Sequence, residues 1–224
     1  EAGTALTTGD GNVAIGFEAL KTEDAHGNNV AIGHQALKTL NAGAAGENTA
    51  VGYLAGTALT LGVGNTLTGT NSGDALTHAD FNTAIGTGTL GSDTQGNKST
   101  AIGYAALFAQ NQTDDTNNTA VGYLSGTAIT VGVRNTLVGD RSGAALTDAD
   151  KNTAIGGESL TTDTLGSKST AIGRSALKSQ NFTTATDSHN TAVGNSAGES
   201  VTTGTNNTLI GSLAGDALTD GNQN

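Results

Sequence analysis

The sequence contains no proline, cysteine, methionine or tryptophan, and its aromatic residues are limited to three Tyr and four Phe in 224 residues. The absence of cysteine excludes disulfide bonds and thiolate chemistry. A globular core of this length normally draws much of its buried area from aromatic side chains. We therefore expect a narrow core built from Ala, Val, Ile and Leu, repeated along an axis.

Basic residues are scarce as well, because nine Lys and Arg stand against 20 Asp and Glu, a formal net charge of −11. A nucleic-acid-binding surface needs a basic stripe that replaces counterions. Docking to an anionic membrane also needs positive charge on the protein. No apolar run approaches the roughly 18 residues of a membrane helix. The sequence thus predicts no nucleic-acid partner and no membrane insertion in this segment.

Glycine is abundant, with 34 residues, and many of these glycines close a repeated motif. In this motif Asn or Ser is followed by Thr or Val, then Ala or Leu, then usually Ile or Val, then a glycine that we call the anchor glycine. The steps between anchor glycines are 17, 19 or 21 residues, so the motif defines twelve units. The anchor glycines are Gly16, Gly33, Gly52, Gly69, Gly86, Gly103, Gly122, Gly139, Gly156, Gly173, Gly194 and Gly211.

A slower rhythm groups the units in blocks of four. Two units whose nine-residue core ends in Leu, such as residues 12–20, precede two whose core ends in Gly, such as residues 48–56. The longer steps fall only between the second and third units of a block. Their extra residues form three predicted long turns, residues 38–47, 108–117 and 178–189.

The length of the unit points to one architecture. Seventeen residues are too few for a helix-pair repeat, which needs about 33 or more, but they suit one coil of a β-solenoid with two short strands and two turns. We expect the motif to form the first strand, and segments such as 57–64 and 74–81 to form the second. The prediction is an all-β parallel β-solenoid of about twelve coils, a single repeat domain over residues 1–224 and part of a longer fibre.

Both faces of the motif strand carry apolar residues, since neighbours in a strand point to opposite faces. Thr and Ile share one face, where burial is expected, and Asn and Ala share the other. Parallel strands that are apolar on both faces are usually covered on both. We therefore predict a side-by-side homo-oligomer closed by cyclic symmetry. A monomer whose small Ala-rich face tolerates water is the alternative.

The Asn residues that open the motif also form a regular row. We interpret the row as a structural ladder, in which each amide bonds to the copy one coil away and satisfies turn backbone groups. A polar binding strip is the alternative reading. The row comprises Asn12, Asn29, Asn48, Asn65, Asn82, Asn118, Asn135, Asn152, Asn190 and Asn207, with Ser99 and Ser169 at two places.

The stretches NVAIGFEAL (12–20), NVAIGHQAL (29–37) and STAIGYAAL (99–107) resemble the head repeats of trimeric autotransporter adhesins, the YadA-like head family. The resemblance implies a left-handed parallel β-roll, three chains packed side by side, and adhesion to host matrix or other surfaces. It covers nearly the whole chain. The units here are longer than is usual for that family, and Thr mostly replaces Val. Other stretches are similar to repeats of phage tail fibres.

Several short stretches match catalytic, nucleotide-binding or metal-binding motifs, but the repeat or the missing structural context explains each match better. Ser196 stands in G-x-S-x-G, but the same unit positions elsewhere read GYLAG and GYLSG, and no helix pattern follows. The G-x-G-x-x-G at 86–91 lacks its helix too. Residues 147–152 begin like a calcium loop without its later Gly and Glu. The four His sit at different unit positions. We predict no catalytic residue, no metal and no cofactor.

Two features are candidates for ligand binding. The position after the anchor glycine varies freely and holds Tyr53, Tyr104 and Tyr123, and surface aromatics are common contact residues. The long turns recur every four coils, and loops inserted in solenoids often lie on a binding face. The alternatives are padding of the coil edge, contact with the next subunit, or neutral decoration. The candidates from the turns are Phe108, Asn111, Asn181 and Phe182, and both Asn residues also open N-x-T sequons.

These observations favour a structural and adhesive module of an extracellular fibre, which binds a protein or glycan surface through many weak contacts and avidity. The location would be extracellular, on a cell surface or a virion. A phage tail-fibre or secretion-system fibre shaft is the close alternative. An ice-binding solenoid, suggested by the long Thr row, is less favoured because the Thr residues share a face with Ile. An enzyme is disfavoured, since no unit supplies clustered carboxylates.

Overall fold

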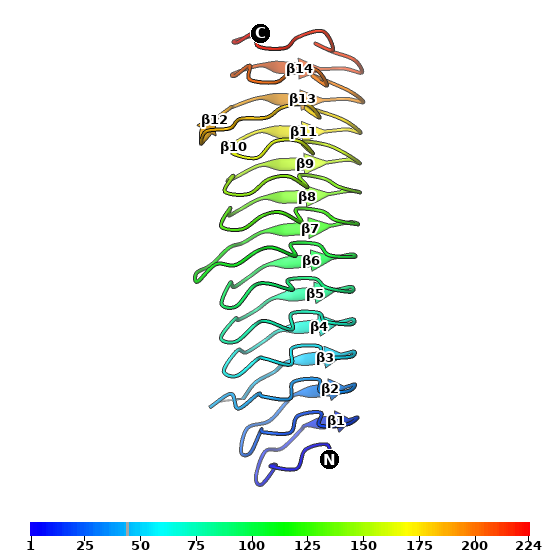
Figure 1. The fold of residues 1–224 in the computed structure, drawn as a ribbon, viewed down its shortest axis with the longest axis vertical. Helices are drawn as coiled ribbons and strands as arrows, with labels where there is room; N and C mark the ends of the chain where they lie inside the picture. Colours follow the sequence, from blue (N-terminus) through cyan, green and yellow to red (C-terminus); the bar gives the residue numbers. More distant parts are fainter. Residues whose placement is uncertain (44) are drawn as a thin grey trace. The chain divides into compact units, whose positions relative to one another are not determined.

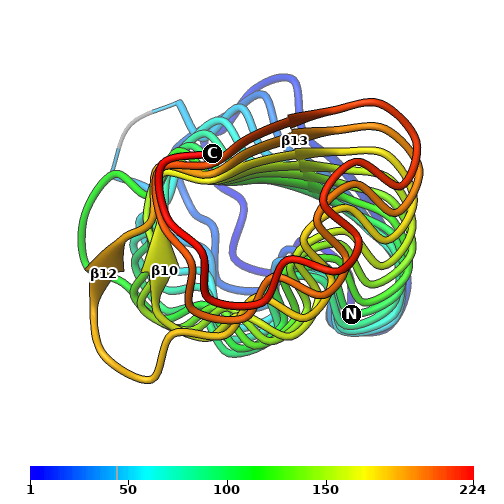
Figure 2. The same ribbon diagram turned by 90° about the horizontal axis from the view of Figure 1, so that it is seen from above.

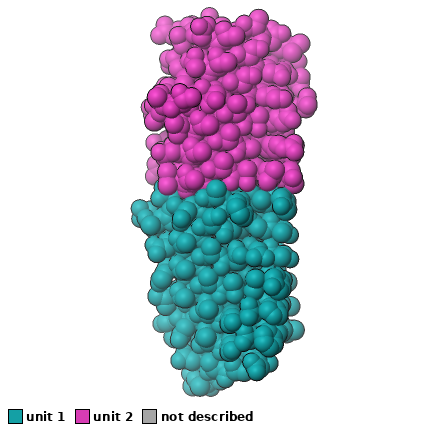
Figure 3. All heavy atoms as spheres, in the orientation of Figure 1, with its two compact units in different colours: residues 1–116 teal, residues 117–224 magenta. Residues whose placement is uncertain are grey.

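The computed structural model describes residues 1–43 and 45–224. The chain forms two compact units, unit 1 (residues 1–116) and unit 2 (residues 117–224), coloured separately in Figure 3. The described residues contain strands and turns but no helix. The prediction of an all-β parallel β-solenoid is confirmed, with about twelve coils, one for each repeat of the motif.

In unit 1 each repeat motif forms one three-residue strand, and each strand pairs in parallel with the next (Figure 1). The register places equivalent residues opposite each other, so Thr66 faces Thr83 and Leu67 faces Ala84. The strands are β1 (Val13–Ile15), β2 (Val30–Ile32), β3 (Thr49–Val51), β4 (Thr66–Thr68), β5 (Thr83–Ile85) and β6 (Thr100–Ile102).

Unit 2 repeats the arrangement. Its motif strands are β7 (Thr119–Val121), β8 (Thr136–Val138), β9 (Thr153–Ile155), β11 (Thr170–Ile172), β13 (Thr191–Val193) and β14 (Thr208–Ile210), all paired in parallel and in register. A second short pairing joins β10 (Gly166–Ser167) to β12 (Thr186–Asp187) at the long turn.

The second half of each coil is mostly turn, and this corrects the sequence prediction, because segments 57–64 and 74–81 contain no strand. The backbone of the first segment's coil shows the cause. Leu54, Gly56 and Gly64 all have left-handed conformations, with φ of 57°, 59° and 68°. The chain changes direction at each of these positions, so the residues between them form turns instead of an extended strand.

The anchor glycines are required by their conformation and by the stacking of coils. Gly139 has φ of 137°, a region that residues with a side chain rarely adopt. A Cβ placed there would lie 2.6 Å from the carbonyl oxygen of Gly156 in the next coil. The backbone of neighbouring coils therefore meets at the anchor glycine, immediately after each strand.

The core explains why the nine-residue motif ends in Leu or in Gly. In Leu-type units that residue, for example Leu160, is fully buried in a left-handed conformation. In Gly-type units the same place holds Gly143, and the core is filled by Leu146 three residues later and by Leu137 in the strand. A Cβ on Gly143 would lie 2.8 Å from atoms of both leucines. The two unit types are thus alternative ways of filling one narrow core.

The structure reverses the expected orientation of the strands. The Ala and Asn face is the one buried inside the coil, as Ala154 and Asn152 show with 0% and 1% exposure, respectively. The Thr and Ile face points outward, and Ile155 is 37% exposed. Alanine faces inward because the coil is narrow and leucines from the turns already occupy its centre. We call the outward face, with its Thr row and its Ile or Val row, the sheet face.

The buried Asn row forms the ladder that the sequence predicts. Asn65 donates from its side-chain amide to Oδ1 of Asn48 at 3.0 Å and to the carbonyl oxygen of Ala79 at 2.7 Å. Its own Oδ1 accepts the backbone N–H of Asn82 at 3.0 Å. Every buried side-chain N or O atom in the described residues has a partner. The ladder therefore links consecutive coils without leaving a buried polar group unpaired.

Candidate functional surfaces

No pocket opens among the described residues, so candidate sites must lie on the surface. Of the predicted tyrosines, Tyr53, Tyr104 and Tyr123 are 51%, 53% and 47% exposed, respectively. Each lies at the edge of its own coil, directly after an anchor glycine. The structure thus places each tyrosine where a partner can reach it.

The edge carries an aromatic stack in unit 1 that the sequence did not single out. The ring of His34 stacks between Phe17 and Tyr53, with centroid separations of 5.2 Å on both sides. Consecutive coils place the three rings one above another, and each ring is exposed. The rings present their edges to solvent along the stack, which favours contact with a surface over enclosure of a small ligand.

Tyr123 belongs to a charged group in unit 2. The Arg141 guanidinium lies 5.6 Å from the Tyr123 ring centroid and 3.3 Å from a carboxylate oxygen of Asp140. Both charged side chains are about half exposed, where an ion pair contributes little to stability. The contact positions the tyrosine ring against the coil edge and leaves part of it accessible.

Phe108 is 45% exposed and opens the second long turn. Its ring packs over two glycines of the preceding coil, since a Cβ on Gly91 would lie 2.8 Å from the ring and one on Gly88 would lie 3.7 Å away. The G-x-G-x-x-G stretch therefore leaves room for this ring, because its glycines have no side chains there. The glycines have a packing role here, and no helix follows them.

The two asparagines of the long turns are part of a second ladder. Thr94 donates its hydroxyl to Oδ1 of Asn111 at 2.9 Å, and Thr164 does the same to Asn181 at 3.1 Å. Asn111 is exposed and Asn181 is half-buried. Both residues therefore continue a row of threonine hydroxyls across the turn, a structural role that the sequence reading did not anticipate.

Phe182 does not lie where the prediction placed it. The ring is 6% exposed and packs against Gly166 of the preceding coil. The turn folds back over the coil and covers the ring because the backbone N–H of Phe182 is bonded to the carboxylate of Asp163 at 3.0 Å. Phe182 therefore stabilises the turn from beneath and offers no contact surface to a ligand.

A buried polar cluster holds this long turn in place. The Asp163 carboxylate accepts the backbone N–H groups of Gly166 and Phe182, each at 3.0 Å, and the side-chain amide of Gln180 at 2.6 Å. Gln180 also donates to the hydroxyl of Ser169 at 2.9 Å. All of these polar side chains are buried. The sequence signal for the cluster was Ser169, which stands where most units have the ladder Asn. The smaller serine leaves space that Gln180 fills.

The same cluster occurs in unit 1, one block earlier in the sequence. Gln110 donates to Asp93 at 2.5 Å, and Ser99 lies within 3.3 Å of Gln110. Burial raises the pKa of Asp93, and the hydrogen bonds from Gln110 and from backbone N–H groups oppose that rise in part. The recurrence with identical partners identifies the cluster as a structural clamp of the long turns.

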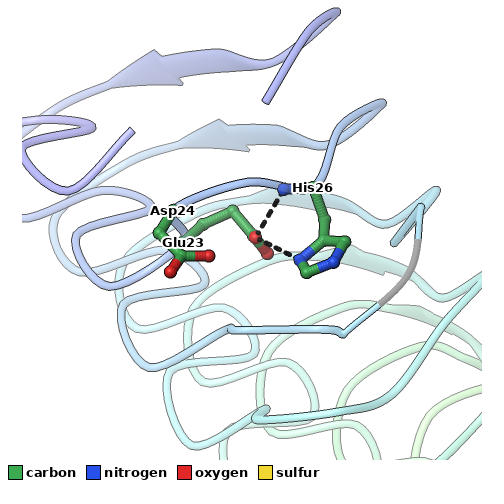
Figure 4. A group of neighbouring side chains, drawn as sticks. All are labelled: Glu23, Asp24 and His26. Atoms are coloured by element: carbon green, nitrogen blue, oxygen red, sulfur yellow. Dashed lines mark hydrogen bonds and ion pairs between the residues drawn. The ribbon is translucent and has the colours of Figure 1, made fainter. Parts of the chain in front are cut away.

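Glu23 occupies the position in the first block that Asp93 and Asp163 occupy in the later blocks. With Asp24 and His26 it forms the one group of possible metal ligands in the described residues (Figure 4). Glu23 is buried, and its carboxylate accepts the backbone N–H of His26 at 3.1 Å and that of Ala42 at 3.3 Å. These are the bonds that Asp163 makes in its own coil. Glu23 is therefore explained as a turn clamp, and the group supplies no independent sign of a metal.

The other sequence candidates for chemistry also have structural roles. Asp150, in the segment that opens like a calcium loop, accepts the backbone N–H of Val133 at 2.8 Å, while Asp148 is exposed. Ser196 is 7% exposed and sits at a left-handed turn position with φ of 54°. Neither arrangement resembles a nucleophile elbow or a coordination loop.

An ion-pair cluster lies at the start of unit 1. The Glu18 carboxylate contacts the ammonium groups of Lys21 at 2.5 Å and Lys38 at 2.7 Å, and it accepts the Gln35 amide at 2.8 Å. Lys21, then Lys38 and Gln35, lower the pKa of Glu18 to about 2. The cluster ties two consecutive coils together, and its oxygens are occupied by the chain itself.

No described helix is long and apolar enough to cross a membrane. The fold and surface define a parallel β-solenoid repeat protein. Comparison with known proteins matches no family model, no curated protein and no solved structure. The likeness to adhesin head repeats therefore stays a prediction from the motifs.

Proposed function

We propose that this chain is a structural and adhesive module of an extracellular fibre, on a cell surface or a virion. The observation that supports it best is the unbroken register inside each unit. Every motif strand of unit 2 faces its neighbour residue for residue, and the coils are further joined by Asn and Thr ladders. A module of this kind is stiff, and it holds surface side chains at fixed intervals.

The adhesive part of the proposal rests on the exposed aromatics of the coil edge. Tyr104 and Phe108 belong to the same coil of unit 1 and are both about half exposed. Single contacts of this size are weak, but a fibre that presents many of them gains affinity through avidity. The expected ligand is a protein or glycan surface.

Binding of the full chain to immobilised matrix proteins and glycans tests this part. Tyr104→Ala should weaken adhesion, whereas Thr87→Ala, an exposed residue at the same coil position one coil earlier, should not. Thermal denaturation of both variants checks that the fold is intact. Equal adhesion of the two variants would remove the tyrosine edge from the proposal.

Self-association is the second part of the proposal. The sheet face of unit 1 carries Val51, Ile85 and Ile102 with no charged residue in the two rows, although the chain has a net charge of −11. Copies that meet there avoid like-charge repulsion and cover exposed methyl groups. Three copies are proposed because the motifs resemble trimeric adhesin heads. Light scattering tests the assembly, and a monomeric mass at high concentration would remove it.

A phage tail-fibre or secretion-system fibre shaft remains the alternative setting, since the same module serves either. Electron microscopy of native material with a label on this chain separates the two. Label on cell-borne fibres supports the cell-surface setting, and label on virions supports the phage setting.

A further inference from the structure

Threonine forms two different rows in unit 2, and the first row is fully used by the chain. In this turn row, Thr130 donates its hydroxyl to the carbonyl oxygen of Thr147 at 3.3 Å, and Thr147 donates to that of Thr164 at 3.1 Å. Thr164 completes the row by donating to Asn181. The turn row therefore joins coils and offers no free donor.

The second row lies on the sheet face and behaves differently. Within the described part of the chain, no hydroxyl of this row bonds to another protein group. Because every buried side-chain polar atom there has a partner, these unbonded hydroxyls reach the surface. The row comprises Thr119, Thr136, Thr153, Thr170, Thr191 and Thr208, all half-buried or exposed.

An apolar row runs beside these hydroxyls. It lies two residues further along each strand, and it comprises Val121, Val138, Ile155, Ile172, Val193 and Ile210. Ile155 and Ile172 are 37% and 36% exposed, respectively. Neither row contains a charged residue in a chain that carries 20 acids. The sheet face of unit 2 is thus an uncharged array of hydroxyl and methyl groups.

The array is regular from coil to coil. Thr136 faces Thr153 and Val138 faces Ile155, without a bulge. The hydroxyl groups therefore repeat at about 4.8 Å from coil to coil, and the apolar row runs parallel to them about 6.6 Å away, the spacing of alternate residues. Figure 2 shows the coils of unit 2, green to red, lying over one another with a small rotation between neighbours.

Water is the ligand whose own structure fits this array. Each free hydroxyl anchors a water molecule at nearly the strength of a direct hydrogen bond, and the methyl groups between them force the remaining water to bond to itself. The coil-to-coil repeat of the hydroxyl groups is close to one of the oxygen repeats on a prism face of ice. We propose that the sheet face of unit 2 binds the surface of ice crystals.

This inference goes beyond the fibre proposal and does not rest on it. It depends on the outward orientation of the Thr row, for which the sequence analysis expected burial. It also competes with self-association, since a sister copy on the same face would exclude ice. A copy would have to meet the free hydroxyls with polar groups, because a buried hydroxyl without a partner is costly.

Freezing-point hysteresis of the full chain and its partition into a growing ice front test the proposal directly. We expect the unaltered chain to show both, and Thr153→Lys to lose most of each. Thr162→Lys adds the same charge at an exposed turn position of the same coil and should retain both. Thr136→Lys, at an exposed position of the row, is the second variant if Thr153→Lys unfolds.

Light scattering on the same samples separates this proposal from the previous one. A monomer without hysteresis or partition overturns the ice proposal and self-association together. An oligomer without hysteresis overturns the ice proposal alone and favours copies as the cover of the sheet face. Hysteresis that Thr162→Lys removes as completely as Thr153→Lys also overturns the assignment to this face.

Discussion

The side-chain amide of Gln180 lies 2.6 Å from Oδ2 of the buried Asp163 carboxylate, and the same pair recurs one block earlier as Gln110 and Asp93. The glutamine compensates for a missing ladder asparagine, since Ser169 stands where most coils have Asn. The first block has no such pair, because Asn29 stands in the ladder and Leu40 stands at the glutamine position.

Gln180→Leu should therefore destabilise the protein by about 1–3 kcal/mol, because it leaves a buried carboxylate oxygen without its donor. The double variant Gln180→Leu with Ser169→Asn places the Leu and Asn of the first block at these two positions, beside Asp163 instead of Glu. It should recover part of the loss by supplying a ladder amide. Urea denaturation measures both, and a double variant less stable than the single one would contradict the compensation.

Gly139, an anchor glycine, and Gly157, the residue after the next anchor glycine, make a matched pair for testing backbone strain. Gly139→Ala should cost about 2 kcal/mol or more, because φ of 137° is strained for alanine and its Cβ would meet the Gly156 carbonyl at 2.6 Å. Gly157→Ala should be close to neutral, since a Cβ there meets nothing nearer than the Asp140 carbonyl oxygen at 4.0 Å. Thermal unfolding of the two variants checks the contrast, and equal losses would refute it.

Core filling gives a second matched test. Gly143→Leu should destabilise the protein by about 1–3 kcal/mol through overpacking, because Leu146 and Leu137 already occupy the space. Adding Leu146→Ala vacates that space and should restore part of the stability. Denaturant midpoints report the effect. If the double change is worse than the sum of two independent losses, the two unit types are not alternative fillings of one core.

The Glu18 ion pairs predict a pH dependence. Lys21, Lys38 and Gln35 hold the pKa of Glu18 near 2, below its ordinary value of 4.5. A carboxylate with a lowered folded-state pKa contributes stability above its unfolded pKa, and that contribution is lost as pH falls through the folded value. Stability should therefore decrease between about pH 4.5 and 2 in part through this group.

Comparison of the unaltered chain with Glu18→Gln isolates the contribution. The variant should be less stable at pH 7, and the difference between the two proteins should shrink as pH falls from 4.5 to 2. Melting temperatures across this range measure it. A difference that stays constant or grows on acidification would show that the ion pairs do not act as proposed.

The sequence by itself determined the period, the parallel β-solenoid and the amide ladder, because each follows from residues that recur at a fixed interval. Gly139 and Asn65 stand out as members of rows in the sequence alone. The interval also located the long turns, although it did not show that Phe182 is covered or that Asn111 and Asn181 continue a threonine ladder. Those outcomes depend on how a turn folds back over its own coil.

Only the tertiary structure decided which face of the strand is inside. Alternation separates Ala154 from Ile155 but does not say which of the two faces the core, since both are apolar. The width of the coil decides: in the coil of Ala154, Leu160 enters from a left-handed turn position and leaves room only for alanine in the strand. The larger Ile155 side chain and the threonine hydroxyls are therefore placed outside, on the surface where the proposed binding takes place.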